Sequence, residues 1–217
     1  SAGSAAIEMS DRMLNPDRSL QATRYFFAPS AHSLKEGEGY ASANVLALGN
    51  VSYGLTPNLI GGLSMSFLGA GITAKASTEL TEGIRGSAGM LYQLSWAGGQ
   101  VFFPFANVTF GDENNHLTLA GGYLGGQLER NASPEDRIDS PMFNLSGCVQ
   151  ISDNAWLMTE NYLFANPEFF PVNVVGSFGL RLWRPMRGRL FEPAILFLAD
   201  ADEGPRPFPW LSWTWPF

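Results

Sequence analysis

The chain has 217 residues, a formal net charge of -7 and only two lysines, which excludes nucleic acid as a partner because phosphate is held mainly by dense Lys/Arg contacts. No run of 18 apolar residues occurs, and this excludes membrane-spanning helices. The single cysteine, Cys148, excludes an internal disulfide and any cysteine-based zinc cluster.

Residues 1–21 do not follow the strand pattern of the rest and predict a short N-terminal extension, in the periplasm or in the mouth of a barrel. Within it, Ala5 to Leu14 are compatible with a short helix that Asn15-Pro16 ends. A loosely held leader to the first strand is the preferred interpretation. The first six residues lack the basic and apolar regions of a cleavable signal. We therefore expect either a cytosolic protein or an exported one whose signal peptide has been removed.

From residue 22 onward, turns rich in Gly, Pro, Asn and Asp separate segments of roughly ten residues, the length that a tilted strand needs to cross a bilayer. Within the segments, apolar and polar residues alternate, as in a strand with two different faces. The pattern predicts strands at 22–28, 40–54, 59–69, 71–80, 84–95, 100–111, 116–127, 141–152, 155–165, 173–184, 189–200 and 207–217.

The connections between these strands alternate in length. Five are short turns, near residues 57, 82, 113, 153 and 186. The others are mostly longer and more polar, at 29–39, 69–71, 96–99, 128–140, 166–172 and 201–206. This asymmetry is typical of outer-membrane barrels, whose short turns are periplasmic. It predicts that both ends of the barrel, and hence the N- and C-termini, are periplasmic.

Several segments divide into two chemically different faces. In 141–152, Asn144 and Ser146 share one face, whereas Phe143 and Leu145 share the other. Segments 40–54 and 71–80 divide in the same way, as expected when one face meets hydrocarbon and the other a polar lumen. The register stays open in 100–111 and in 155–165, where Glu160 and Asn161 are adjacent and face opposite ways unless a bulge intervenes.

The last eleven residues form the most informative segment, because Leu211, Trp213, Trp215 and Phe217 alternate with mostly smaller or more polar residues. Such a stripe suits a strand whose outer face touches lipid, with aromatic rings at the headgroup level. The segment therefore predicts the closing strand of a transmembrane barrel. Aromatic residues near the predicted strand ends define two expected girdles: Tyr53, Trp96, Phe110, Trp156, Trp183, Trp213, Trp215 and Phe217.

These features predict an all-β fold, a single closed, antiparallel, up-and-down transmembrane β-barrel of about twelve strands over residues 22–217. A soluble β-sandwich is the alternative, because its strands also alternate. Sandwich strands are usually only about 5–6 residues long. Interior glycines such as Gly121 and Gly122 weaken a sandwich strand but suit a tightly curved wall.

Two early stretches, 23–31 (TRYFFAPSA) and 34–40 (LKEGEGY), and two later blocks, 114–119 and 149–161, carry a family resemblance. In this order, over most of the chain from about residue 15, they resemble poorly characterised outer-membrane β-barrel proteins of Bacteroidota-type envelopes. The resemblance implies a barrel in the outer membrane. It implies no activity and no catalytic residues.

Charged residues within the predicted strands cannot face lipid cheaply, since a charge at mid-bilayer costs roughly 2–4 kcal/mol. We therefore expect a nearly balanced set to line the lumen: Arg24, Lys75, Glu79, Arg85, Glu160, Arg181 and Glu192. These charges either pair and seal the interior or line a narrow polar conduit. Apolar residues on the same faces favour a mostly occluded lumen: Leu46, Leu48, Phe103, Leu196 and Leu198.

Candidate catalytic and metal sites are weak. A barrel hydrolase needs a nucleophile beside a base, but no serine pairs with His116, and His32 is expected on the opposite side of the membrane. Acidic residues in the loops at 128–140 and 200–204 match no calcium motif. We therefore expect no catalytic residue, no cofactor and no bound metal.

The preferred interpretation is an outer-membrane barrel with a largely occluded polar lumen and a structural or partner-binding role, for example as one subunit of an envelope assembly. The alternative is a narrow passive channel for small polar solutes. An outer-membrane hydrolase is the least supported. Expected partners are outer-membrane lipid and other envelope proteins.

Overall fold

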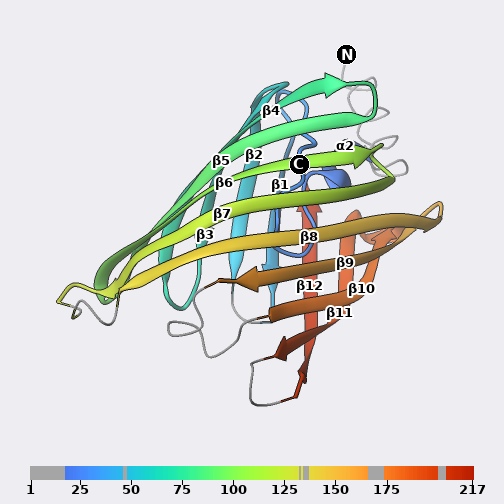
Figure 1. Cartoon of the computed structure of the whole chain (residues 1–217). Helices are drawn as coiled ribbons and strands as arrows, with labels where there is room; N and C mark the ends of the chain where they lie inside the picture. Colours follow the sequence, from blue (N-terminus) through green and yellow to red (C-terminus); the bar gives the residue numbers. More distant parts are fainter. Residues whose placement is uncertain (1–17, 46–47, 132, 134–136, 166–173, 200–203) are drawn as a thin grey trace.

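The computed structural model describes residues 18–45, 48–131, 133, 137–165, 174–199 and 204–217, and its strands form one closed antiparallel ring (Figure 1). Each strand pairs with its neighbours in the chain, and the last pairs with the first. The twelve strands are β1 (Gly39–Asn44), β2 (Gly49–Thr56), β3 (Leu59–Met65), β4 (Gly69–Thr81), β5 (Ile84–Ser95), β6 (Gly98–Gly111), β7 (Asn115–Glu129), β8 (Ile138–Ser152), β9 (Ala155–Phe164), β10 (Val174–Arg184), β11 (Arg189–Ala199) and β12 (Arg206–Pro216).

The C-terminal strand closes the ring, as its aromatic alternation predicts. In β12, Trp215 lies opposite Ala41 and Ser212 opposite Asn44 of β1. Closure pairs the two strands that would otherwise expose unpaired backbone groups, which no bilayer can satisfy. The predicted fold class, a closed antiparallel barrel of twelve strands, is therefore confirmed.

The two faces of the strands also follow the prediction. In β8, Asn144 and Ser146 are buried toward the lumen, whereas Phe143 and Leu145 are exposed on the outside. β4 buries Lys75 toward the lumen in the same way. The exposed outer residues are largely apolar, so the barrel presents the hydrophobic exterior that lipid contact requires.

Two predicted strands are wrong, although the total is right. The expected strand at 22–28 does not form: a five-residue helix, α2 (Arg18–Ala22), is followed by irregular chain with one isolated bridge between Arg24 and Pro29. The expected strand at 40–54 is instead a hairpin of β1 and β2. Consequently the connection at 29–39 is not one of the long loops. No helix among the described residues is long and apolar enough to cross a membrane, and the helix expected at 5–14 lies outside them.

Strand β9 has no bulge at Glu160 and Asn161, so the two side chains point to opposite faces. Glu160 points into the lumen, and Asn161 lies on the opposite face of the strand. There the Asn161 amide donates to the carbonyl oxygen of Leu145 at 3.2 Å and to the hydroxyl of Thr159 at 3.0 Å. Neighbouring residues of the barrel wall thus accept the hydrogen bonds that the Asn161 side chain donates on the outer face.

Two tryptophans of the predicted girdles face the wrong way. Trp156 and Trp183 are only 1% and 3% exposed. Trp156 is four residues from the inward Glu160 and Trp183 two from the inward Arg181, so strand alternation sends both indoles inward. The other predicted members, Tyr53, Trp96, Phe110, Trp213, Trp215 and Phe217, are exposed or partly exposed, and their girdle role stays a prediction.

The barrel wall is uneven in height (Figure 1). Strands β1 to β3 have 6 to 8 residues, whereas β4 to β8 have 12 to 15. β4 continues past β3 on the side of the short turns, since Leu59 pairs with Ala76 and β4 runs on to Thr81. β8 continues past β9 on the side of the long loops, since Met142 pairs with Phe164 and β8 begins at Ile138. One side of the cylinder is therefore much taller than the other.

A single charged substitution tests whether the outer face of the barrel contacts lipid. Leu119 of β7 is exposed and lies opposite Leu145, the central residue of β8. We expect Leu119→Arg to lower the free energy of unfolding by roughly 2–4 kcal/mol, because the guanidinium would lie in hydrocarbon. Denaturant unfolding of the protein folded into lipid vesicles measures the loss. The control is Asn58→Arg in the β2–β3 turn, and equal losses in both variants would show that Leu119 does not face lipid.

Candidate functional site

The lumen contains a stretch of the chain's own N-terminal region (Figure 1). Residues 20–34, hereafter the inner segment, are almost all buried, and their contacts reach lumen-facing side chains on β4, β6, β7, β9, β10, β11 and β12. Contacts in so many directions are possible only if the segment lies inside the ring. Four of the predicted lumen-facing charges on the wall contact it: Lys75, Glu160, Arg181 and Glu192.

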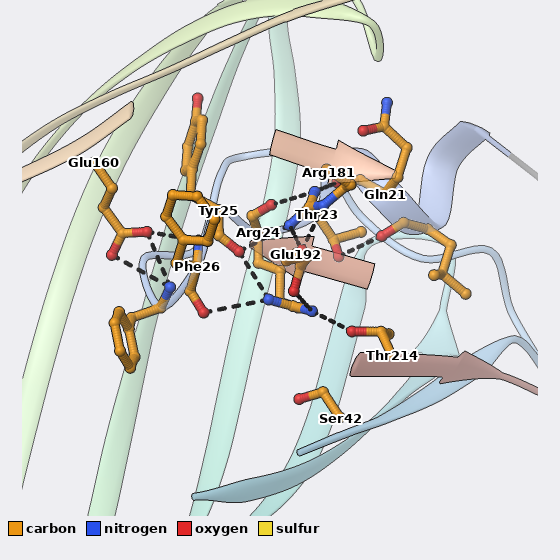
Figure 2. Close-up of polar contacts among 12 residues, drawn as sticks. Gln21, Thr23, Arg24, Tyr25, Phe26, Ser42, Glu160, Arg181, Glu192 and Thr214 are labelled. Carbon is orange, nitrogen blue, oxygen red and sulfur yellow. Dashed lines mark hydrogen bonds and ion pairs between the residues drawn. The ribbon is translucent and has the colours of Figure 1, made fainter. Parts of the chain in front are cut away.

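The strongest of these contacts is an ion-pair cluster in which the Glu192 carboxylate lies between two guanidinium groups (Figure 2). Arg181 Nη2 lies 2.5 Å from one carboxylate oxygen, and Arg24 Nη2 lies 3.1 Å from the other. Arg24 also donates to the Thr214 hydroxyl at 2.5 Å. Because Glu192 and Arg181 belong to the wall and Arg24 to the inner segment, the cluster ties the two together.

A second carboxylate, Glu160, binds the turn of the inner segment. Its oxygens accept a hydrogen bond from the backbone N–H group of Phe26 at 2.6 Å (Figure 2). They also accept from the N–H groups of Phe27 and Ala28, both at 2.9 Å. The Tyr162 hydroxyl donates to the same carboxylate. Three converging amides form a small anion site, and here the anion is supplied by the barrel wall.

The cationic wall residues bind the carbonyl oxygens of the inner segment. Lys75 Nζ donates to the carbonyls of Ser30 at 2.8 Å and His32 at 2.7 Å. Arg181 donates to those of Arg24 and Tyr25, both at 2.9 Å. The wall carboxylate thus binds N–H groups of the inner segment, and the wall cations bind its C=O groups. These side chains provide the hydrogen bonds that a helix or sheet would otherwise provide to the backbone.

Neutral groups complete the attachment. Thr109 accepts from the backbone N–H of Ala31 at 2.8 Å, and Asn107 donates to the carbonyl of Pro29 at 2.9 Å. The hydroxyls of Tyr25 and Thr118 share a hydrogen bond of 2.8 Å. Helix α2 is fixed as well, since Gln21 donates to the carbonyl of Glu113 in the β6–β7 turn at 2.5 Å.

The predicted charged set therefore splits into two groups. Arg24, Lys75, Glu160, Arg181 and Glu192 are buried and meet at the inner segment. Glu79 and Arg85 form a partly exposed pair, with Arg85 Nη2 3.3 Å from the Glu79 carboxylate, at the short-turn rim of β4 and β5. These two residues lie at the rim of the barrel rather than in its interior.

The histidines correct another expectation. His32 was predicted on the opposite side of the membrane from His116, yet their ring centroids lie 5.1 Å apart. The cause is the inner segment, which carries His32 to the short-turn end of the lumen. Burial, with smaller effects from the positive charges of Arg85 and Lys75, lowers the pKa of His32 to about 4, so this imidazole is uncharged at neutral pH.

Two cavities lie on opposite sides of the inner segment. The larger, hereafter the outer cavity, has a volume of about 570 Å³ and extends from Phe26 and Phe27 of the inner segment to the strand ends near the long loops. The smaller, of about 240 Å³, is bordered by His32, Glu79, Arg85 and the short β4–β5 and β6–β7 turns. Any solute crossing the lumen would have to pass the segment between them.

The predicted inward apolar residues contribute to the outer half of the lumen. Leu48 and Phe103 line the outer cavity, Leu196 is buried and Leu198 is half-buried. Leu46 lies outside the described residues, as do parts of the acidic loops at 128–140 and 200–204. The inner segment itself was missed. The signal that could have revealed it is the set of inward charges, which require partners that the wall strands alone do not provide.

Comparisons with solved structures place this fold beside porins. The chain is similar to the NanC porin, with a TM-score of 0.55 and 10% identity over 82% of this chain and 97% of that one. It is equally similar to the KdgM porin solved in complex with disordered oligogalacturonate, with a TM-score of 0.55 and 7% identity over 83% and 98%. No family model and no curated protein matches the chain. At such identities the likeness concerns the fold.

Removing the central carboxylate should release the inner segment. We expect Glu192→Gln to lower the free energy of unfolding by about 3–5 kcal/mol, because it leaves two buried guanidinium groups without their counter-ion. Urea unfolding in lipid vesicles measures the loss. The matched control, Glu79→Gln, breaks a partly exposed pair and should cost less than about 1 kcal/mol. Equal losses would contradict a structural role for the buried cluster.

Proposed function

We propose that the protein is an integral outer-membrane β-barrel that acts as a narrow channel for small polar solutes. The closed ring, its apolar exterior and its similarity in fold to two porins support this proposal. Membership of the Bacteroidota-type family, a removed signal peptide and periplasmic termini belong to the same proposal.

The observation that carries the proposal is the outer cavity. A space of about 570 Å³ lies inside the closed ring and begins where the long loops join the strands. Its inner end is formed by Phe26, Phe27 and neighbouring residues of the inner segment. A solute entering from the long-loop side would therefore meet the inner segment, which we propose as the narrowest part of the path.

The interpretation favoured by the sequence was a largely occluded barrel with a structural or partner-binding role in an envelope assembly. The likeness to porins supports the channel better, since the solved barrels of similar fold are named as porins. Barrels of about 8 strands are filled by side chains and those of 16–18 strands hold open aqueous channels, so a barrel of intermediate size suits a constricted path. That the chain is not an enzyme stays a prediction.

Conductance in planar lipid bilayers tests the channel. We expect small discrete openings from the native protein. Glu160→Gln should raise the conductance, because it removes the negative charge that holds the turn at Phe26–Ala28, and Arg181→Gln should act in the same direction. Glu82→Gln in the exposed β4–β5 turn is the control and should leave the openings unchanged.

The outcome that contradicts the channel is equally clear. If correctly folded native protein and both variants insert into the bilayer without any openings, the lumen does not conduct. The structural, partner-binding role would then be favoured, and purification from native membranes in mild detergent would be the way to find its partners.

A further inference from the structure

The outer cavity has the dimensions of a ligand site. Its volume of about 570 Å³ falls within the range of roughly 300–1,000 Å³ that is typical of small-molecule pockets. It is enclosed by the barrel wall on its sides and by the inner segment at one end. Phe27 stands at that end with 42% of its surface exposed, and its ring packs 4.5 Å from that of the buried Trp210.

One side of this cavity is aromatic. Phe103 and Phe105 of β6 stack with ring centroids 5.8 Å apart, and Tyr162 and Phe164 of β9 stack at 6.3 Å. All four line the cavity, and Leu124 of β7 and Met142 of β8 add apolar surface between them. This side offers a broad area for contact with an apolar ring.

The β6 rings lie against the wall and do not cross the lumen, because glycine on each neighbouring strand makes room for them. A Cβ atom added to Gly122 of β7 would lie 2.5 Å from the ring of Phe103, and one added to Gly89 of β5 would lie 2.6 Å from that of Phe105. Each ring therefore covers a glycine. This arrangement preserves both the aromatic surface and the open space beside it.

The opposite side carries hydroxyl and amide groups beside apolar residues such as Ile60 and Leu91, and no carboxylate lines the cavity among the described residues. Strands β1 to β5 contribute hydroxyl and amide groups: Ser42, Asn50, Ser52, Ser64, Thr73 and Gln93. The two cationic side chains at the cavity are already engaged, Arg24 with Glu192 and Lys75 with backbone carbonyls. A charged ligand would lose hydration here without gaining a counter-ion, which is costly.

We propose that the outer cavity binds an uncharged amphiphile, a molecule with an apolar ring on one side and hydroxyl groups on the other. The ring lies against Phe103 and Phe105, and the hydroxyl groups face the polar side around Asn50 and Gln93. This site goes beyond the channel proposed above, because binding at equilibrium requires no passage past the inner segment. A negative titration would therefore contradict only the ligand site, and a negative conductance measurement would contradict only the channel.

Isothermal titration of the full chain in lipid nanodiscs tests the ligand class, with empty nanodiscs as the blank. The probe is phenyl β-D-glucoside, which joins an uncharged ring to hydroxyl groups. Glucose lacks the ring, and benzoate keeps the ring but adds a charge. We expect saturable one-to-one binding of phenyl glucoside and no saturable binding of either comparison compound. No saturable heat with phenyl glucoside, or equal binding of benzoate, would overturn the proposal.

Three phenylalanines on β6, two facing the cavity and one facing outward, provide matched variants. The double variant Phe103→Leu/Phe105→Leu keeps apolar side chains but removes both ring faces, and should weaken binding roughly tenfold. Phe102→Leu changes the same residue type on the outer face of the same strand and should leave the affinity unchanged. Unchanged affinity in the double variant, or an equal loss in Phe102→Leu, would contradict the site.

Gln93→Leu tests the proposed ligand site independently, because it leaves the aromatic side of the cavity unchanged. It removes an amide from the polar side and should weaken binding of phenyl glucoside about threefold to tenfold, since the ligand loses a hydrogen bond. Gel mobility with and without heating confirms that each barrel is folded. If the double variant does not fold, Gln93→Leu decides: unchanged affinity there contradicts the proposal.

Discussion

A carboxylate buried between two guanidinium groups is the interaction on which the interior of this barrel depends. Glu192 and Arg181 come from adjacent wall strands, and Arg24 comes from a segment more than 150 residues earlier in the chain. Charges on lumen-facing positions avoid lipid, but inside a narrow ring they also lose much of their water. They are stable there only with partners of opposite sign. The inner segment supplies the additional guanidinium group and so becomes part of the barrel's interior.

The same constraint explains how a segment with little secondary structure holds one conformation. Its N–H groups at the turn are bound by Glu160, and its carbonyls are bound by Lys75 and Arg181. Because these side chains come from strands distant in sequence, the segment's shape is specified by the closed ring and not by its own propensities. It follows that the segment can become ordered only after or together with ring closure.

The sequence predicted the ring, its alternating faces and the inward charges, because period-2 alternation and the cost of charge in lipid are local properties. It could not separate β1 from β2. Hairpin partners share a face, and pairs such as Ser42 with Asn50 are an even number of residues apart, so the alternation continues through the loop. The inner segment was mistaken for a strand because it is rich in aromatic residues, which are common in strands. Its place in the lumen depends on contacts across the barrel, which no local pattern contains.

The unequal wall has a consequence for the surrounding membrane. Six residues of β1 span about 20 Å, or about 15 Å in height at a tilt near 40°, whereas fifteen residues of β8 reach about 39 Å. A bilayer's hydrocarbon layer is about 30 Å thick. Hydrophobic mismatch of this kind is relieved by tilting the protein or by compressing the acyl chains beside the short strands. The barrel should therefore sit obliquely in its bilayer, with a patch of thinned lipid next to the seam where the first and last strands meet.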